Sequence, residues 1–382
     1  MKKRVKPDIR AITRLVPPEG NLVQGQSELP IHPRLAEEAA KVISANQNHY
    51  GASEGEQQLR RAVVEKVRKS NNIDLNSDEM DVMITSGGTG ALVGIAVSFL
   101  KNRSALVFEP YYPYHCRIVE QFGGKIEKFE LNENLSFDKN ELFERCQVLK
   151  RRSEYPLSAI IVCSPANPSG KVLNFEELKA VAEVATKLDL MVISDEVYEH
   201  YVCGNNPHIS IASFFDMRKR TITVNSFSKS WNISGWRLGY CYGPKELISQ
   251  VNSVANVVYV CPATPLQKAL AEVLLSEEDY YELLRRDFER KWKFFANELR
   301  NLGFQVYESG SAFYVWAGIP ERFDDSVSFN QMLMEKQQVA GVPGSAFSDS
   351  GRWDAFMRFC IAREDSILEI ALKKIKNALN SS

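Results

Sequence analysis

Short apolar runs alternate with longer amphipathic stretches up to about residue 265 of the chain. Six runs have the length and β-branched composition of strands; they cover residues 81–85, 104–109, 159–164, 190–196, 221–226 and 236–243. Apolar residues at helical spacing occupy residues 34–46, 55–70, 89–101 and 174–188. In the last stretch Asn174 is the expected N-cap, and Glu177 is placed to complete a capping box. The alternation predicts an α/β fold, with a mostly parallel sheet sandwiched by helices.

The pattern changes after residue 265. Long helical stretches follow, then the hairpin-like segment "FQVYESGSAFYVWAG" and a final helix. A chain of 382 residues also exceeds the size at which one hydrophobic core usually stops growing. We therefore predict a large domain at residues 35–265 and a smaller α+β domain formed by residues 1–34 and 266–382.

Composition narrows the class of ligand. The chain has 47 basic and 48 acidic residues, so its formal net charge of -1 gives no electrostatic argument for binding nucleic acid or an anionic membrane. A small-molecule ligand is expected instead. The seven cysteines are scattered without a C-x-x-C pair, which predicts reduced thiols and no metal site. No window approaches 18 apolar residues and no signal peptide is recognisable, so a cytoplasmic location is expected.

Polar and glycine-rich residues follow four of the predicted strands. The segments are "TSGGTG" (85–90), "EPYYPY" (109–114), "SPANPSG" (164–170) and "SDEVYEHY" (194–201). Open sheets of this kind bind ligands beyond the carboxyl ends of their strands. Taken singly, each segment also has an ordinary explanation: a tight glycine turn, an Asx turn at Asn167, or an ion pair at Asp195.

The segment "SFSKSWNISGWRLG" (226–239) adds a lysine, Lys229, without an acidic neighbour in sequence, and an arginine, Arg237. A solvated surface lysine is the ordinary interpretation, since most lysines are exposed. Together, however, the strand-end segments predict one site that holds an amine, a carboxylate, an amide, an arginine and a glycine-rich cradle for an anion.

With these residues in place, the chain resembles the class I/II pyridoxal-phosphate-dependent aminotransferase family, the aspartate aminotransferase-like fold type I. The segment around Lys229 meets each constrained position of that family's lysine signature. Further matches follow in family order: "HYGASEGEQQLRRAV", "TSGGTGAL", "EPYYPY", "NPSG", "SDEVY", "VPGSAF" and "MRFCIA". The resemblance implies a large domain with a seven-stranded, mostly parallel sheet, a smaller α+β domain, and pyridoxal 5'-phosphate as cofactor.

The resemblance also implies roles for three catalytic residues, Lys229, Asp195 and Tyr198. Lys229 would hold the cofactor as an internal aldimine, since an amine forms a reversible imine with an aldehyde, and would then act as general base. Asp195 would pair with the pyridine nitrogen and keep it protonated. Asn167 and Tyr198 would hydrogen-bond the ring's phenolic oxygen.

The remaining cofactor contacts are expected at the phosphate and at the ring face. The residues implied for the phosphate are Gly88, Thr89, Gly90, Ser226 and Arg237. Tyr50 matches a tyrosine that reaches the phosphate of the neighbouring subunit, which implies a homodimer with shared active sites. Tyr112 is expected to stack on the ring, in preference to its neighbours Tyr111 and Tyr114.

Substrate contacts are implied for Arg358, Asn167 and Gly25. Arg358 would take the α-carboxylate, for which a guanidinium fork is suited. Arg363, out of register with the motif, is interpreted as a surface residue. The chain departs from the family at Thr89, where some acid-specific members have a lysine, and at residues 26–28, so the resemblance does not define the substrate side chain.

Three functions are compatible with these residues. The favoured one is an aminotransferase that moves an amino group between an L-amino acid and a 2-oxo acid. A pyridoxal-phosphate-dependent C–S or β-lyase of the same fold would use the same lysine and carboxylate. A non-catalytic, amino-acid-sensing regulator is disfavoured, because such regulators carry a DNA-binding domain ahead of the motifs, and here the motifs begin by residue 25.

Overall fold

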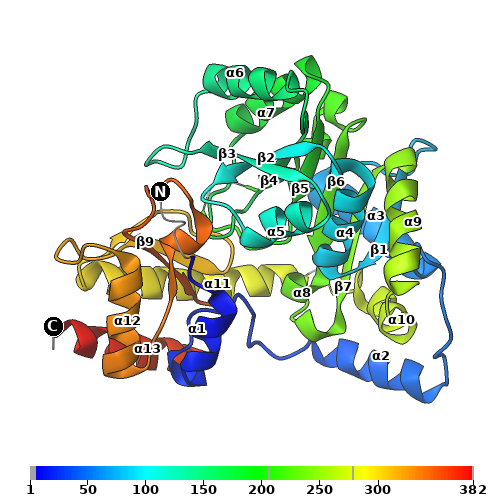
Figure 1. The fold of residues 1–382 in the computed structure, drawn as a ribbon. Coiled ribbons are helices and arrows are strands. Elements are labelled where there is room, and N and C mark those ends of the chain that lie inside the picture. Colours follow the sequence, from blue (N-terminus) through cyan, green and yellow to red (C-terminus); the bar gives the residue numbers. More distant parts are fainter. Residues whose placement is uncertain (1–5, 205–206, 278, 381–382) are drawn as a thin grey trace.

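The computed structural model describes residues 6–204, 207–277 and 279–380, and its centre is a seven-stranded sheet (Figure 1). The strands are β1 (Met80–Ser86), β2 (Ser104–Glu109), β3 (Lys125–Glu130), β4 (Leu157–Cys163), β5 (Met191–Asp195), β6 (Thr221–Ser226) and β7 (Leu238–Pro244). Their order is β1-β7-β6-β5-β4-β2-β3. All neighbours are parallel except β7, which is antiparallel to both β1 and β6. The predicted α/β class and mostly parallel sheet are confirmed.

Two strands differ from the sequence-based expectation. The edge strand β3 was not predicted, because its sequence "KIEKFE" is rich in charge and only part of it is buried. β7 begins at Leu238, two residues later than expected, because Arg237 adopts a left-handed conformation with φ of 56° and ends a short 3₁₀ turn. That conformation sets the direction in which the Arg237 side chain leaves the backbone.

Helices cover both faces of the sheet, as predicted. One core cluster packs α4 (Gly87–Ile95), α5 (Pro113–Gln121) and α9 (Lys245–Tyr259) on one face. Another packs α6 (Lys139–Lys150) and α7 (Phe175–Lys187) on the opposite face. The expected capping box of Asn174 and Glu177 begins α7. The helix expected at residues 89–101 instead begins at Gly87 and passes into a π-helical turn at Ala96–Leu100.

Beside the large sheet lies a four-stranded sheet of order β10-β11-β9-β8 (Figure 1). Its strands are β8 (Gln305–Val306), β9 (Tyr314–Gly318), β10 (Val342–Pro343) and β11 (Phe356–Cys360). The helices α11 (Asp279–Asn301), α12 (Ser326–Gln337) and α13 (Asp365–Asn380) pack with it around a separate core cluster. This is the smaller α+β unit that the sequence predicts, although the boundaries at residues 35 and 265 remain predictions.

The other helices are α1 (Ile9–Leu15), α2 (Pro33–Ser44), α3 (Gln57–Asn71), α8 (Phe227–Ser230) and α10 (Thr264–Val273). Within the described ranges no helix is long and apolar enough to cross a membrane. All seven cysteines are described, and each is a free thiol.

A buried ion pair joins α3 to the segment after β5. Lys66 contacts Glu199, and both side chains are at most 5% exposed. Burial raises the pKa of Glu199, but the charge of Lys66, helped by His200 and His208, outweighs this and holds the pKa well below its usual range. Glu199 also accepts a hydrogen bond of 2.5 Å from Asn225, whose own side chain accepts one from the backbone N–H of Ser226. The pair therefore supports the end of β6.

Replacing Lys66 by methionine is expected to lower the free energy of unfolding by about 3–5 kcal/mol at pH 7, because Glu199 loses its buried counter-charge. Denaturant unfolding at a fixed protein concentration measures the change. The double variant Lys66→Met with Glu199→Gln is the control, and we expect it to recover part of the loss. A loss below about 1 kcal/mol in the single variant would show that the pair is not needed.

Candidate active site

A cavity of about 810 Å³ opens at the carboxyl ends of the large sheet, between it and the smaller unit. The predicted site residues that line it are Gly25, Gly88, Thr89, Tyr112, Asn167, Asp195, Tyr198, Ser226, Lys229, Arg237 and Arg358. Two others do not line it. Gly90 faces Ser86 and Tyr259 instead, and Tyr50 is 88% exposed elsewhere on the chain. The structure thus brings eleven of the thirteen predicted residues together.

Lys229 lies on α8, the short helix that follows β6. Its Nζ donates a 2.5 Å hydrogen bond to the carbonyl of Gly25, and its own carbonyl accepts one of 2.8 Å from the buried Tyr201 hydroxyl. Burial lowers the pKa of Lys229 to about 8, and the charges of Arg358 and Arg237 act in the same direction. The amine is therefore far easier to deprotonate than an ordinary lysine.

Competitive labelling of the cofactor-free protein with acetic anhydride, read by mass spectrometry, is expected to give a midpoint near pH 8 for Lys229. The reference is a lysine in a short unstructured peptide, which has an ordinary lysine pKa of about 10.4. Between these pH values the unfolded chain binds the Lys229 proton more tightly than the folded chain. The contribution of this group to stability therefore rises with pH across that window. Equal midpoints for the two lysines would contradict the account.

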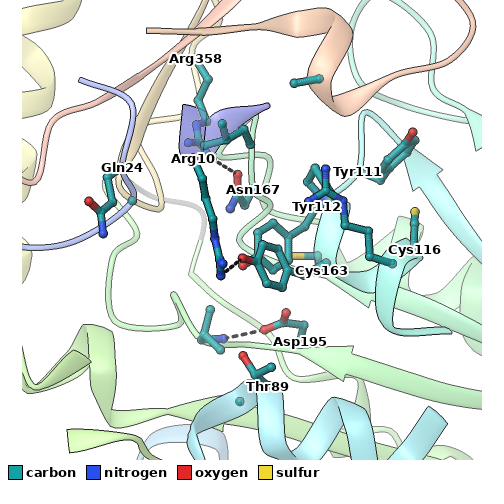
Figure 2. A pocket seen from close by; sticks show the side chains of 18 of the residues that line it. Arg10, Gln24, Thr89, Tyr111, Tyr112, Cys116, Cys163, Asn167, Asp195 and Arg358 are labelled. Carbon is teal, nitrogen blue, oxygen red and sulfur yellow. Dashed lines mark hydrogen bonds between the residues drawn. The ribbon is translucent and has the colours of Figure 1, made fainter. Parts of the chain in front are cut away.

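Asp195 ends β5 and is only 4% exposed. Its Oδ2 lies 2.7 Å from Nε2 of His115, and its Oδ1 accepts a long hydrogen bond from the backbone N–H of Val197. Figure 2 shows Asp195 among the residues that line the cavity. His115 is itself buried on α5 and was not predicted as a site residue. The imidazole orients this carboxylate at the edge of the cavity.

The N-terminus of α4 forms the glycine-rich end of the cavity. Gly87 has φ of 66°, and a Cβ there would come within 2.5 Å of the Arg237 guanidinium, so a glycine permits this close approach. No side chain caps the helix. Arg237 donates to the carbonyl of Ser234 at 2.9 Å, and the hydroxyls of Ser226 and Ser228 are nearby. Free backbone N–H groups, two hydroxyls and a guanidinium form a binding site for an anion such as a phosphate.

Arg358 comes from β11 of the smaller sheet and is 3% exposed. It donates to Oδ1 of Asn167 at 2.7 Å and to the carbonyl of Val23 at 2.6 Å. Its Nε has no hydrogen-bond partner among the described residues, and none of their carboxylates pairs with its charge. A buried cation with a spare donor is suited to a carboxylate ligand.

Tyr314 is a site residue that the sequence analysis missed. It lies on β9, and its hydroxyl is 2.8 Å from the hydroxyl of Tyr198 and 3.4 Å from Nδ2 of Asn167. The Arg358 guanidinium sits 4.3 Å from its ring centroid. A Cβ at Gly25 would overlap the Tyr314 hydroxyl, which explains why a glycine is needed there. The sequence "AFYVWAG" marks this strand only as buried core.

Arg363 is not a surface residue, and that expectation was wrong. It is 6% exposed, and it pairs with Glu28 and approaches Asn21. The partners lie more than 300 residues away in sequence, so the spacing in the motif gave no sign of them. Arg363 fixes the N-terminal segment that carries Gly25 against the smaller unit.

The three neighbouring tyrosines occupy different positions. Tyr112 precedes α5 and its ring meets that of His115 edge-on at 5.2 Å. Tyr114 stacks on Tyr112 with ring centroids 5.3 Å apart. The hydroxyl of Tyr111 accepts a hydrogen bond from Lys6 and donates one to Asp349. Tyr112 is therefore the tyrosine whose ring contacts His115, the partner of Asp195.

Comparison with known proteins agrees with this geometry. The model of the family "Aminotransferase class I and II" matches residues 19–375. Over 357 residues the chain is 30% identical to the aspartate aminotransferase of Pyrococcus abyssi, covering 93% of this chain and 90% of the relative. It is 32% identical to aromatic-amino-acid aminotransferase 2 of Thermococcus litoralis, and that match covers 93% of this chain and 90% of the relative.

Among solved structures, the N-succinyldiaminopimelate aminotransferase of Mycobacterium tuberculosis superposes with a TM-score of 0.90 at 30% identity, covering 97% of this chain and 96% of that one. The family model spans nearly the whole chain, and both the sheet order and the cavity lie within the matched residues. The chain therefore belongs to the class I and II aminotransferase family, with the fold type I architecture.

Proposed function

We propose that this protein is a pyridoxal-phosphate-dependent aminotransferase that uses Lys229 to hold its cofactor and to move the substrate's α-proton. The observation that carries the proposal is the meeting of four groups from four elements in one cavity: Lys229, Asp195, Arg237 and Arg358. The relatives are named for acidic, aromatic and succinylated amino acids. These names support the reaction type, but they do not define which substrate side chain this protein prefers.

The residues present fit the cofactor at both of its ends. At one end, the uncapped first turn of α4, Arg237 and Ser226 would hold the phosphate. At the other, the buried Asp195 would pair with the pyridine nitrogen, with Tyr112 over the ring. When bound, the cofactor supplies an electron sink that stabilises negative charge on the substrate α-carbon.

The substrate would be oriented by Arg358. Its guanidinium would take the α-carboxylate in a bidentate pair. The ring centroids of Tyr314 and Phe347 lie 4.3 Å and 4.9 Å from the guanidinium carbon, and these contacts would restrict the orientation of the fork. Asn167, which already bonds Arg358, would share in this contact and couple it to the ring side of the site.

Lys229 would carry the proton. Since its pKa is lowered to about 8, about a tenth of the amine is neutral at pH 7 and about half at pH 8, and the neutral amine can accept a proton from the α-carbon. Tyr198, held by Tyr314, would assist by hydrogen-bonding the ring's phenolic oxygen.

A homodimer is part of the proposal. Tyr50 is 88% exposed and lies outside the cavity of its own chain, so its expected phosphate contact requires a second subunit. Val257 and Val258, near the end of α9, are also strongly exposed apolar residues that an interface would cover. We propose a cytoplasmic location because the seven cysteines are free thiols, as is usual in a reducing compartment.

A single-turnover assay tests the function. Loaded protein mixed with an amino donor, without any 2-oxo acid, is expected to release one equivalent of 2-oxo acid per subunit and then stop. Adding a 2-oxo acid acceptor should restart turnover. Sustained release of ammonia without acceptor would instead support the lyase and overturn the proposal.

A further inference from the structure

One arginine in the cavity has no role in the reaction described so far. Arg10 lies on α1, and its side chain extends from that helix into the cavity (Figure 2). Its Nη2 donates a 2.5 Å hydrogen bond to the Tyr114 hydroxyl. Because Tyr114 stacks on Tyr112, this contact brings the guanidinium beside the aromatic residues that line the cavity floor.

Three other charged residues near Arg10 have partners of their own. Lys6 and Lys128 both pair with Asp349, and the Asp8 carboxylate accepts from the first backbone N–H groups of α1. Arg10 forms no ion pair with any of the described residues, and its guanidinium donates its hydrogen bond to a neutral hydroxyl, that of Tyr114. The guanidinium is therefore a cation that faces the cavity without a counter-charge.

Two more arginines, Arg14 and Arg117, line the same cavity and are exposed. Neither of their guanidinium groups hydrogen-bonds to a described residue of the cavity lining, whereas that of Arg10 bonds to Tyr114. Asp8 and Glu120 are the remaining acidic lining residues besides Asp195 and Asp349. Basic residues thus outnumber acidic ones in the cavity lining. Arg10, like Arg14 and Arg117, is exposed, but it is the one of these three whose guanidinium is held by a hydrogen bond to another lining residue.

We propose that Arg10 binds the side-chain carboxylate of the substrate, so that the preferred amino donors and acceptors are dicarboxylic acids. The inference rests on the proposed aminotransferase function and names the substrate class of that site. Arg358 on β11 and Arg10 on α1 would each take one carboxylate. The guanidinium exchanges its bond to a neutral hydroxyl for charge-assisted bonds to a carboxylate, which are about twice as strong.

The variant Arg10→Gln tests the proposal, with Arg14→Gln on the same helix as the matched control. Arg10→Gln is expected to lower kcat/KM for aspartate and glutamate by about 10- to 100-fold and to leave alanine and phenylalanine within about threefold. Arg14→Gln should leave both groups of donors within about threefold. Succinate, which cannot react, should bind the loaded wild type more tightly than butyrate by calorimetry, and Arg10→Gln should remove that difference.

Three results would overturn the inference: a wild-type preference for aromatic or neutral donors, equal losses in the two variants, or equal binding of succinate and butyrate. Each can occur while the protein still transaminates some donor. Failure of the proposed function is a different result, because then no donor of any class would yield a 2-oxo acid.

Discussion

Replacing Lys229 by alanine is expected to reduce turnover by about 10⁴-fold or more, because one side chain supplies both the covalent attachment and the proton transfer. Folding should be little affected, since Lys229 is partly exposed and its amine bonds only to the carbonyl of Gly25 among the described residues. The variant should also lose the visible absorbance that the wild type gains with pyridoxal phosphate. Steady-state kinetics and an absorbance titration measure the two effects.

Lys179→Ala is the matched control, because Lys179 is exposed on α7 on the side of the sheet away from the cavity. Its turnover and absorbance should equal those of the wild type. Activity of Lys229→Ala within tenfold of the wild type would mean that another group performs the proton transfer.

Asp195→Asn is expected to lower kcat by about 10²–10³-fold and to weaken cofactor binding by about 10- to 100-fold. Asparagine keeps the size of the side chain, and it can still contact His115, but it has no charge to hold the pyridine nitrogen protonated. The cofactor then becomes a poorer electron sink, so the effect falls on kcat more than on KM.

The control for this charge removal is Asp78→Asn, an exposed carboxylate that precedes β1. Its kinetics should match the wild type. If Asp195→Asn bound the cofactor and turned over normally, the pairing of Asp195 with the ring would be wrong, and the buried contact with His115 would have only a structural role.

Much of this fold could be predicted from the sequence because most strands are apolar runs between amphipathic helices. β3 could not, because an edge strand keeps one side in solvent and tolerates charged residues such as Lys125 and Glu130. β7 was predicted two residues too early, since the left-handed conformation of Arg237 is not encoded by a glycine or asparagine.

Most of the residues expected around the cofactor line one cavity, because they follow strand ends or belong to the lysine signature. Gly90 and Tyr50 do not line it, and the roles of the others stay predictions. Tyr314, His115 and Arg10 were missed for a different reason. Tyr314 belongs to a strand whose apolar sequence predicts only a buried core position. The role proposed for Arg10 depends on the position of α1 at the cavity, which the sequence does not indicate. Arg363 was interpreted as a surface residue because it is out of register with the motif, and nothing in the sequence indicated its partner Glu28, 335 residues away. Such contacts arise only when the two units pack together.

The most direct test of the central claim is to locate the covalent attachment of the cofactor. Protein incubated with pyridoxal phosphate is treated with borohydride, which makes the reversible amine–aldehyde linkage permanent, and its peptides are mapped by mass spectrometry. The account predicts one adduct per subunit, on Lys229, and none in Lys229→Ala. An adduct on another lysine, or no adduct in the wild type, would contradict it.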